Sequence, residues 1–345
     1  MRLEKGQTAM KSVTLSTAIA PMFFMATFCA TPTFAHTQED ASLRHRLELL
    51  AQKVDGKLGV CALESGHRLA CVNGDIRFSL QSVMKLVVGA AVMEAVDQRG
   101  WRLTDKVVLR EEDLSLHVQP LARIVRKDGE FRTTIGDLVE RAVTQSDSAA
   151  TDYLFARLGG SEAIRDFLVR SGVAEGLRID RDERHLQTEI SGVTWQPEFV
   201  DPLELQAARA RLSHDEQRSA FAAYLRDERD TATPLAMATF LDRLARGEIL
   251  SPSSTEHFLE VLKRTKTFPT RLRAGAPDGW AVAHKTGTSH DSLGVNAVTN
   301  DVGILTRPNG TTIAIAAFLG HSRATAADRD AAIAAAAREV GEAWK

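Results

Sequence analysis

The apolar residues of the chain recur at spacings that predict both helices and strands. The stretch QSVMKLVVGAAVME, from Gln81 to Glu94, is apolar on almost every face and predicts a buried helix over residues 82–99. Residues 40–57 have the spacing of an amphipathic helix ending at Gly56. Two short apolar runs around the polar letters ESGH predict a β-hairpin within residues 58–79.

The second half of the chain predicts a sheet that is completed late in the sequence. The runs WAVAHKTGTS, NDVGILTRP and TTIAIAAFLG predict three strands, and an alanine-rich helix follows them. The region between about residues 100 and 250 is mainly helical in pattern. If the N-terminal hairpin joins the late strands, the fold is α/β, with residues 36–80 and 235–345 in one discontinuous subdomain and 81–234 in a helical subdomain.

Residues 188–226 predict a helical hairpin of their own. Asp201 followed by Pro202 is typical of a helix start, and so is Ser213 with Glu216 three residues later. An apolar helix pattern follows each of these caps.

The first 35 residues have the pattern of a secretory signal peptide. Three basic residues precede an apolar run over 13–30, and Thr33 and Ala35 occupy the −3 and −1 positions of a cleavage site. The sequence therefore predicts a periplasmic or secreted protein without stable membrane association after cleavage. An N-terminal membrane anchor is the alternative.

Cleavage after Ala35 would leave two of the three cysteines, Cys61 and Cys71. A hairpin turn near Ser65–Gly66 would place them opposite each other, and an oxidising compartment permits a disulfide. Two free buried thiols are the alternative. The chain has neither a CxxC pair nor an HExxH motif, so we expect no metal and no cofactor.

Charge gives no indication of a nucleic-acid partner. Lys and Arg number 43 against 45 Asp and Glu, and 44% of the residues are hydrophobic. This balance is that of an ordinary soluble domain and does not favour nucleic acid or membrane surfaces.

Ser82 and Lys85 lie three residues apart in the predicted buried helix, and therefore on one face of it. An apolar environment disfavours the charged form of a lysine, and a neutral amine beside a hydroxyl is a plausible base for a serine nucleophile. Taken alone, a serine and a lysine at this spacing occur by chance in many chains.

Two further polar stretches could carry chemistry. HKTGTS places Lys285 and Thr286 at the end of an apolar strand, where they suit an anionic group, although a polar turn is the simpler explanation. QSDSAATDYL places Ser146 and Asp147 at a helix start, where an ordinary N-cap would explain them.

In this order, the three motifs resemble those of the class A serine β-lactamases, within the penicillin-recognising serine acyl-enzymes. The resemblance spans about residues 40–345 and includes RDTATPLAMATFL and NDVGILTRPNG. It implies an antiparallel sheet flanked by helices together with an all-helical subdomain. It also implies a monomer that acts on a small-molecule β-lactam.

The resemblance implies a role for each matching residue. Ser82 would be the nucleophile, Lys85 its proton partner, and Ser146 the donor of a proton to the lactam nitrogen. Lys285 and Thr286 would hold the substrate carboxylate. The residues with the remaining implied roles are Thr288, whose N–H joins that of Ser82 in an oxyanion hole, and Arg271, near the carboxylate.

The letters RIDRDERHLQ match the Ω-loop pattern of the same family over Asp180 to Leu186, with the loop spanning residues 178–230. Glu183 would activate the deacylating water, and Arg181 would pair with Asp230. The local sequence is rich in charge, so a solvated surface glutamate is the alternative at Glu183.

Three departures from the family pattern bear on activity. Ser148 replaces an asparagine that contacts the substrate amide, and Gln187 replaces another that helps to hold the water. The interval 188–226 holds 39 residues where relatives have a handful. The resemblance thus favours β-lactam hydrolysis, with a D-Ala-D-Ala peptidase or a non-hydrolytic penicillin sensor as alternatives.

Overall fold

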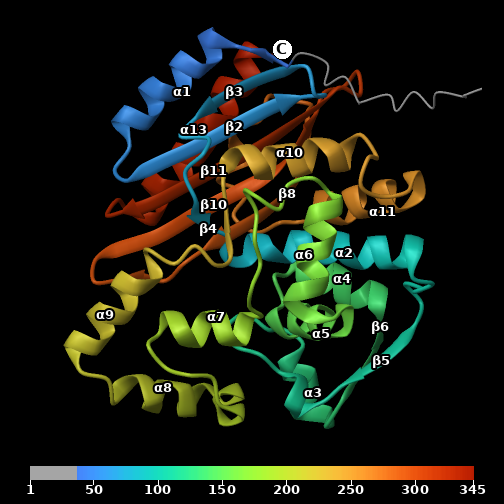
Figure 1. Ribbon diagram of the computed structural model, residues 1–345, viewed down its shortest axis with the longest axis vertical. Coiled ribbons are helices and arrows are strands. Elements are labelled where there is room, and N and C mark those ends of the chain that lie inside the picture. The colour runs from blue at the N-terminus through green and yellow to red at the C-terminus, as the bar shows by residue number, and fades with distance from the viewer. Residues whose placement is uncertain (1–36) are drawn as a thin grey trace, which may run out of the picture. The chain divides into compact units, whose positions relative to one another are not determined.

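A seven-stranded sheet is the frame on which the helices pack (Figure 1). The computed structural model describes residues 37–345, and the predicted signal peptide lies outside them. The strand order is β1-β3-β2-β11-β10-β8, with β9 paired to β10. The strands are β1 (Gln38–Glu39), β2 (Lys57–Glu64), β3 (Arg68–Val72), β8 (Ala281–Thr288), β9 (Asp291–Ser292), β10 (Val295–Thr306) and β11 (Thr312–Ser322).

The N-terminal hairpin joins the late strands, as predicted, because β2 pairs with β11. The four long strands are antiparallel to their neighbours. The predicted antiparallel sheet is thus present, and at one edge the short strand β1 adds a parallel pair with β3. There the chain adds two residues to the sheet edge before Asp40 caps the first helix, α1 (Ala41–Lys53).

Both faces of the sheet are buried, and alternation along β11 separates them. Ile313, Ile315 and Leu319 pack with residues of α1 and α13 (Ala326–Ala343) on one face. Ala314, Ala316 and Phe318 belong to the larger core on the other face. Because successive side chains of a strand point to opposite faces, this continuous apolar strand serves two cores.

The larger core continues into a group of helices around α2 (Met84–Gln98). The buried helix predicted over 82–99 is present, but it begins with a 3-10 turn, η1 (Gln81–Val83). Helix α1 ends at Lys53, before the predicted Gly56, because Val54 is already extended.

The boundaries of the two predicted subdomains are not tested by the structure and stay a prediction. The other helices before residue 191 are α3 (Ala122–Asp128), α4 (Ile135–Thr144), α5 (Ser148–Leu158), α6 (Gly160–Arg170) and α7 (Glu183–Ile190), with η2 (Glu111–Asp113).

The predicted helical hairpin within 188–226 is present as α8 (Pro202–Ala210) and α9 (His214–Tyr224), after a short turn η3 (Pro197–Val200). Asp201 caps α8, and Ser213 and Glu216 form the expected capping box of α9. Helix α7 lies between α9 and α5 (Figure 1). We call residues 202–224 the α8–α9 hairpin.

The remaining elements connect these parts. Two short strand pairs, β4 with β7 and β5 with β6, lie outside the main sheet.

Cys61 and Cys71 face each other on β2 and β3 and form the predicted disulfide. Between residues 37 and 345, no helix is long and apolar enough to cross a membrane. The elements not yet bounded are β4 (Phe78–Ser79), β5 (Lys106–Leu109), β6 (Phe131–Thr134), β7 (Thr231–Ala232), α10 (Pro234–Ala245), α11 (Pro252–Lys263) and α12 (Leu272–Gly275).

Candidate active site

Ser82 lies in the 3-10 turn that precedes α2, between the sheet and the helices. The turn is held from the sheet, because the Asn300 side chain on β10 donates to the carbonyls of Ser79 (2.8 Å) and Leu80 (3.1 Å). Gln81 has a positive φ of 47°, which turns the chain sharply before the serine. Ser82 is half-buried, whereas Gln81 is buried, so the serine is the accessible residue of the turn.

The amine of Lys85 is the centre of the site. It donates to Ser82 Oγ at 3.0 Å and to Ser148 Oγ at 3.2 Å, and it lies 2.9 Å from Glu183 Oε1. The prediction that this amine lies in an apolar environment is therefore wrong. Helix α2 is apolar on its packed faces, but its first turn also faces the start of α5 and the start of α7, which supply Ser148 and Glu183 as polar partners.

Ser146 lies between two lysines. Its hydroxyl accepts from Lys285 Nζ at 3.1 Å and, at 3.4 Å, from Lys85 Nζ, while its carbonyl accepts from Lys85 at 3.0 Å. Its φ of 58° places it outside the helix, and the neighbouring Asp147 is the N-cap of α5. The cap expected in this stretch is thus Asp147, which leaves the Ser146 hydroxyl to the site.

Strand β8 brings Lys285, Thr286 and Thr288 to the same place. Lys285 is fully buried, and burial together with the charge of Lys85 lowers its pKa to about 7. Packing within the protein requires a glycine at position 287, because a Cβ on Gly287 would lie 2.6 Å from the carbonyl oxygen of Leu80. The absence of a side chain at Gly287 therefore lets β8 pack closely on the turn that contains Ser82.

Arg271 lies behind β8 rather than in the open site. It is buried, and its guanidinium donates to Asp330 at 2.6 Å and to the carbonyl of Asn300 at 2.9 Å. It reaches the site through Thr288, whose hydroxyl it contacts at 2.9 Å. The predicted role of Arg271 near the substrate carboxylate stays a prediction.

Glu183 is 2% exposed, so the alternative of a solvated surface glutamate is wrong. Besides Lys85, it accepts from Gln187 Nε2 at 3.1 Å, and the same amide donates to Gln81 Oε1 at 3.0 Å. Burial raises the pKa of the Glu183 carboxyl, but the charge of Lys85 and hydrogen bonds from Lys85 and Gln187 outweigh it and lower the pKa overall. The carboxylate is accordingly ionised at neutral pH.

The ion pair expected between Arg181 and Asp230 is present at 2.6 Å. Asp230 also accepts from the N–H groups of Asp180 (2.7 Å) and Arg181 (3.0 Å). Its own carbonyl accepts from Leu80 N–H at 2.9 Å. Asp230 therefore joins the chain before Glu183 to the chain before Ser82.

Asp152 on α5 is a site residue that the motifs did not indicate. It is buried and accepts from the N–H of Glu183 at 2.8 Å and from Ser115 Oγ at 2.6 Å. Burial, and then the negative charges of Asp182 and Glu183, raise its pKa to about 7. Its position four residues after Ser148, on the same helix face, was the available signal.

Tyr224, at the end of α9, is a second residue that sequence reasoning missed. Its hydroxyl accepts from Gln81 Nε2 at 2.5 Å and donates to Ser79 Oγ at 2.8 Å. A chain of hydrogen bonds thus runs from the α8–α9 hairpin through Gln81 and Gln187 to Glu183. No local sequence signal indicates this contact, because Tyr224 and Gln81 are 143 residues apart.

Comparison with known proteins agrees with this arrangement. A family model described as "Beta-lactamase enzyme family" matches residues 42–344. A β-lactamase from Citrobacter koseri is 29% identical, covering 93% of this chain and 94% of the relative. Beta-lactamase SME-1 from Serratia marcescens is 28% identical, covering 88% and 90%.

Solved structures show the same relationship. An ancestral class A β-lactamase, a last common ancestor of Gram-negative bacteria, has a TM-score of 0.69 and 33% identity over 88% of this chain and 100% of that one. A β-lactamase from Chitinophaga pinensis has a TM-score of 0.72 at 25% identity, with the same coverage. The chain therefore belongs to the β-lactamase enzyme family, within class A.

Proposed function

We propose that the protein hydrolyses β-lactams through an acyl-enzyme on Ser82, with Glu183 activating the water that releases the product. The observation that carries this proposal is the position of Lys85, which contacts both Ser82 Oγ and Glu183 Oε1. One amine thus connects the group that is acylated to the group that would deacylate it.

In the acylation step, Ser82 Oγ attacks the lactam carbonyl while the Lys85–Glu183 pair takes up its proton. Ser146 Oγ, which both lysines contact, delivers a proton to the nitrogen as the C–N bond breaks. Lys285 and Thr286 hold the substrate carboxylate, and the N–H groups of Ser82 and Thr288 stabilise the oxyanion.

In the deacylation step, the ionised Glu183 takes a proton from a water that attacks the ester carbonyl. The ester bond to Ser82 breaks and the serine regains its proton. Gln187 fixes one oxygen of Glu183, and Asp152 fixes its backbone N–H. A buried carboxylate held in this way favours hydrolysis over the persistent acyl-enzyme of a peptidase or a sensor.

Export to the periplasm or the medium is part of the proposal. The signal-peptide pattern of residues 1–35 and the Cys61–Cys71 disulfide both support it, since disulfides persist in oxidising compartments. A monomeric state stays a prediction.

Intact-mass spectrometry after mixing with benzylpenicillin tests the function. We expect the mass of the drug to appear on the protein transiently and the unmodified mass to return while the drug is consumed. An adduct that persists for hours on the unaltered protein would contradict hydrolysis and favour a sensor or a peptidase. The Ser82→Ala variant should form no adduct.

A further inference from the structure

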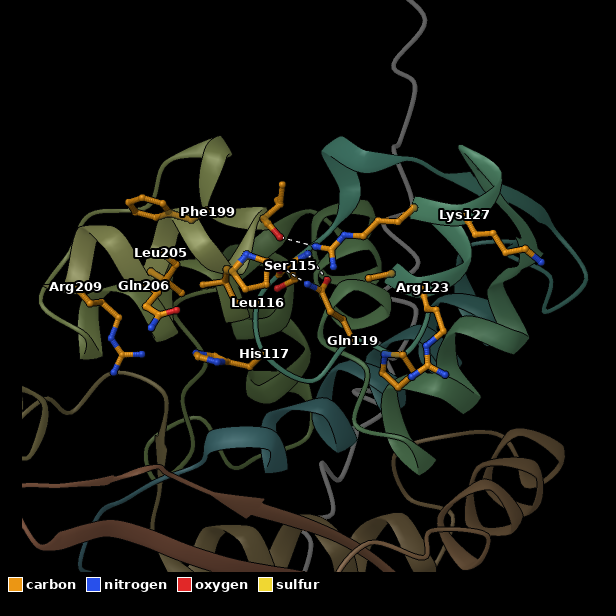
Figure 2. A pocket seen from close by; sticks show the side chains of 15 residues that line it. Ser115, Leu116, His117, Gln119, Arg123, Lys127, Phe199, Leu205, Gln206 and Arg209 are labelled. Carbon is orange, nitrogen blue, oxygen red and sulfur yellow. Dashed lines mark hydrogen bonds between the residues drawn. The ribbon is translucent and has the colours of Figure 1, made fainter.

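A cavity of about 940 Å³ opens beside the site, between α3 and the α8–α9 hairpin (Figure 2). Four cationic side chains line it, and within residues 37–345 no acidic side chain does. We call this cavity the basic pocket. Its cations are Arg123, Arg126, Lys127 and Arg209.

Most of this positive charge is not neutralised by the protein. Arg126 donates to the carbonyl of Val200 at 2.7 Å and lies 3.8 Å from Glu111. In the part of the chain that the structure describes, Arg123, Lys127 and Arg209 form no ion pair. Unpaired cations around one cavity attract an anion.

The basic pocket begins where the proposed substrate site ends. His117 lines the pocket, and its ring points toward the part of the pocket where Arg209 lies (Figure 2). The charges of Lys85 and Glu183 also act on this ring. The next residue, Val118, accepts from the N–H of Ser148 at 2.8 Å. A group that passes Ser148 therefore meets His117 and then the pocket.

The direction of a bound β-lactam follows from the proposed function, on which this inference rests. Its ring carboxylate lies at Lys285 and its carbonyl at Ser82, so its acylamino side chain extends past Ser148. We propose that the basic pocket binds a second carboxylate at the far end of a long acyl side chain. Phe199 and Leu205 supply apolar lining for the methylene groups of that chain.

A matched pair of substrates isolates the second carboxylate. Adipoyl- and hexanoyl-6-aminopenicillanic acid have side chains of the same length, and only the adipoyl chain ends in a carboxylate. We expect kcat/KM for the adipoyl substrate to exceed that for the hexanoyl substrate by about 5-fold, as two exposed ion pairs would give. The preference should weaken in 0.5 M salt, which screens such pairs.

The double variant Arg123→Gln/Arg209→Gln removes two of the four cations, one from each wall of the basic pocket. It should bring the ratio of the two kcat/KM values to about one, whereas the control Arg211→Gln, just beyond α8 and outside the pocket lining, should keep the unaltered ratio. A ratio of one or less in the unaltered protein, or a ratio that the double variant does not change, would overturn the proposal.

A binding measurement separates this inference from the proposed function. In the Ser82→Ala background, calorimetry compares the Kd values of the two substrates without requiring turnover. Tighter binding of the adipoyl compound that depends on Arg123 and Arg209 supports the basic pocket even if hydrolysis fails. Equal Kd values would overturn the pocket even if both compounds are hydrolysed by the unaltered enzyme.

Discussion

At the level of single residues, the main feature of the site is a set of buried ionisable side chains in direct contact. Lys85 and Glu183 are both almost fully buried and lie 2.9 Å apart, and Lys285 shares the Ser146 hydroxyl with Lys85. The charge of Lys85 favours the ionised form of the Glu183 carboxyl. The same charge disfavours the charged form of the Lys285 amine. The pH dependence of activity and stability should therefore arise from contacts between specific residues.

Lys285 should limit activity at alkaline pH. Its pKa of about 7 means that the fraction of charged amine falls as the pH rises from 6 to 8. If the charged form binds the substrate carboxylate, as proposed above, kcat/KM for benzylpenicillin should be about tenfold lower at pH 8 than at pH 6. A pH–rate profile measures this fall.

The Lys285→Arg variant is the control, since arginine stays charged over this range. Its profile should be flat between pH 6 and pH 8, whatever its absolute rate. The same alkaline fall in both proteins would assign the titration to another group, and a flat profile in the unaltered enzyme would rule out Lys285 as the limiting charge.

Asp152 should make the folded state less stable at alkaline pH. Its pKa in the folded state, about 7, lies above the ordinary carboxyl value of 3.8, so folding favours the protonated form. Its contribution to stability is complete below about pH 4 and is lost as the pH rises through 7. The neutral variant Asp152→Asn should therefore gain about 1–3 kcal/mol relative to the unaltered protein between pH 5 and pH 8.

Denaturant unfolding at pH 5 and pH 8 measures that gain. A stability difference between the two proteins that is the same at both pH values would contradict the assignment, because it would reflect packing alone.

The α8–α9 hairpin is the element whose effect on the site is most direct. It contributes one wall of the basic pocket through α8, and through α9 it contributes the hydroxyl of Tyr224. That hydroxyl holds Gln81, and Gln81 in turn accepts from Gln187 beside Glu183. The hairpin thus supports Glu183, the proposed deacylating group, and also lines one side of the basic pocket.

Tyr224→Phe removes this support without removing the ring. Loss of a buried hydrogen bond costs about 0.5–1.5 kcal/mol, so a looser Glu183 should slow deacylation about 2- to 10-fold. Rapid-quench mass spectrometry should show more acyl-enzyme at steady state than in the unaltered protein.

Tyr153→Phe is the matched control, since the Tyr153 hydroxyl makes no hydrogen bond to any of residues 37–345. If Tyr224→Phe slows turnover without accumulation of acyl-enzyme, the hairpin acts on acylation instead and this explanation is wrong.

At the scale of the whole molecule, the site assembles at the junction of the sheet with the helices. Lys285 comes from β8, Lys85 from α2, Ser146 from the turn before α5, and Glu183 from α7. Apolar periodicity predicted β8 and the helix that carries Lys85, because burial of one or both faces leaves a regular pattern. Glu183 was expected in a loop and instead begins α7. The motifs predicted which of their residues meet.

Other parts of the site could not be predicted from the sequence. The polar surroundings of the Lys85 amine depend on α5 and α7, and the Tyr224–Gln81 contact depends on how α9 packs against the turn before α2. Such contacts join residues far apart in sequence and leave no periodic or motif signal. Asp152 lies between these cases, because it shares a helix face with Ser148 but only the structure shows Glu183 opposite it.

Glu183→Gln tests whether Glu183 releases the acyl group from Ser82, as proposed. The amide keeps the size and hydrogen bonding of the side chain but cannot accept the proton of water. Intact-mass spectrometry with benzylpenicillin should show rapid acylation and an adduct that persists, with turnover reduced by at least about 100-fold. Turnover equal to that of the unaltered enzyme, with no adduct, would contradict this proposal.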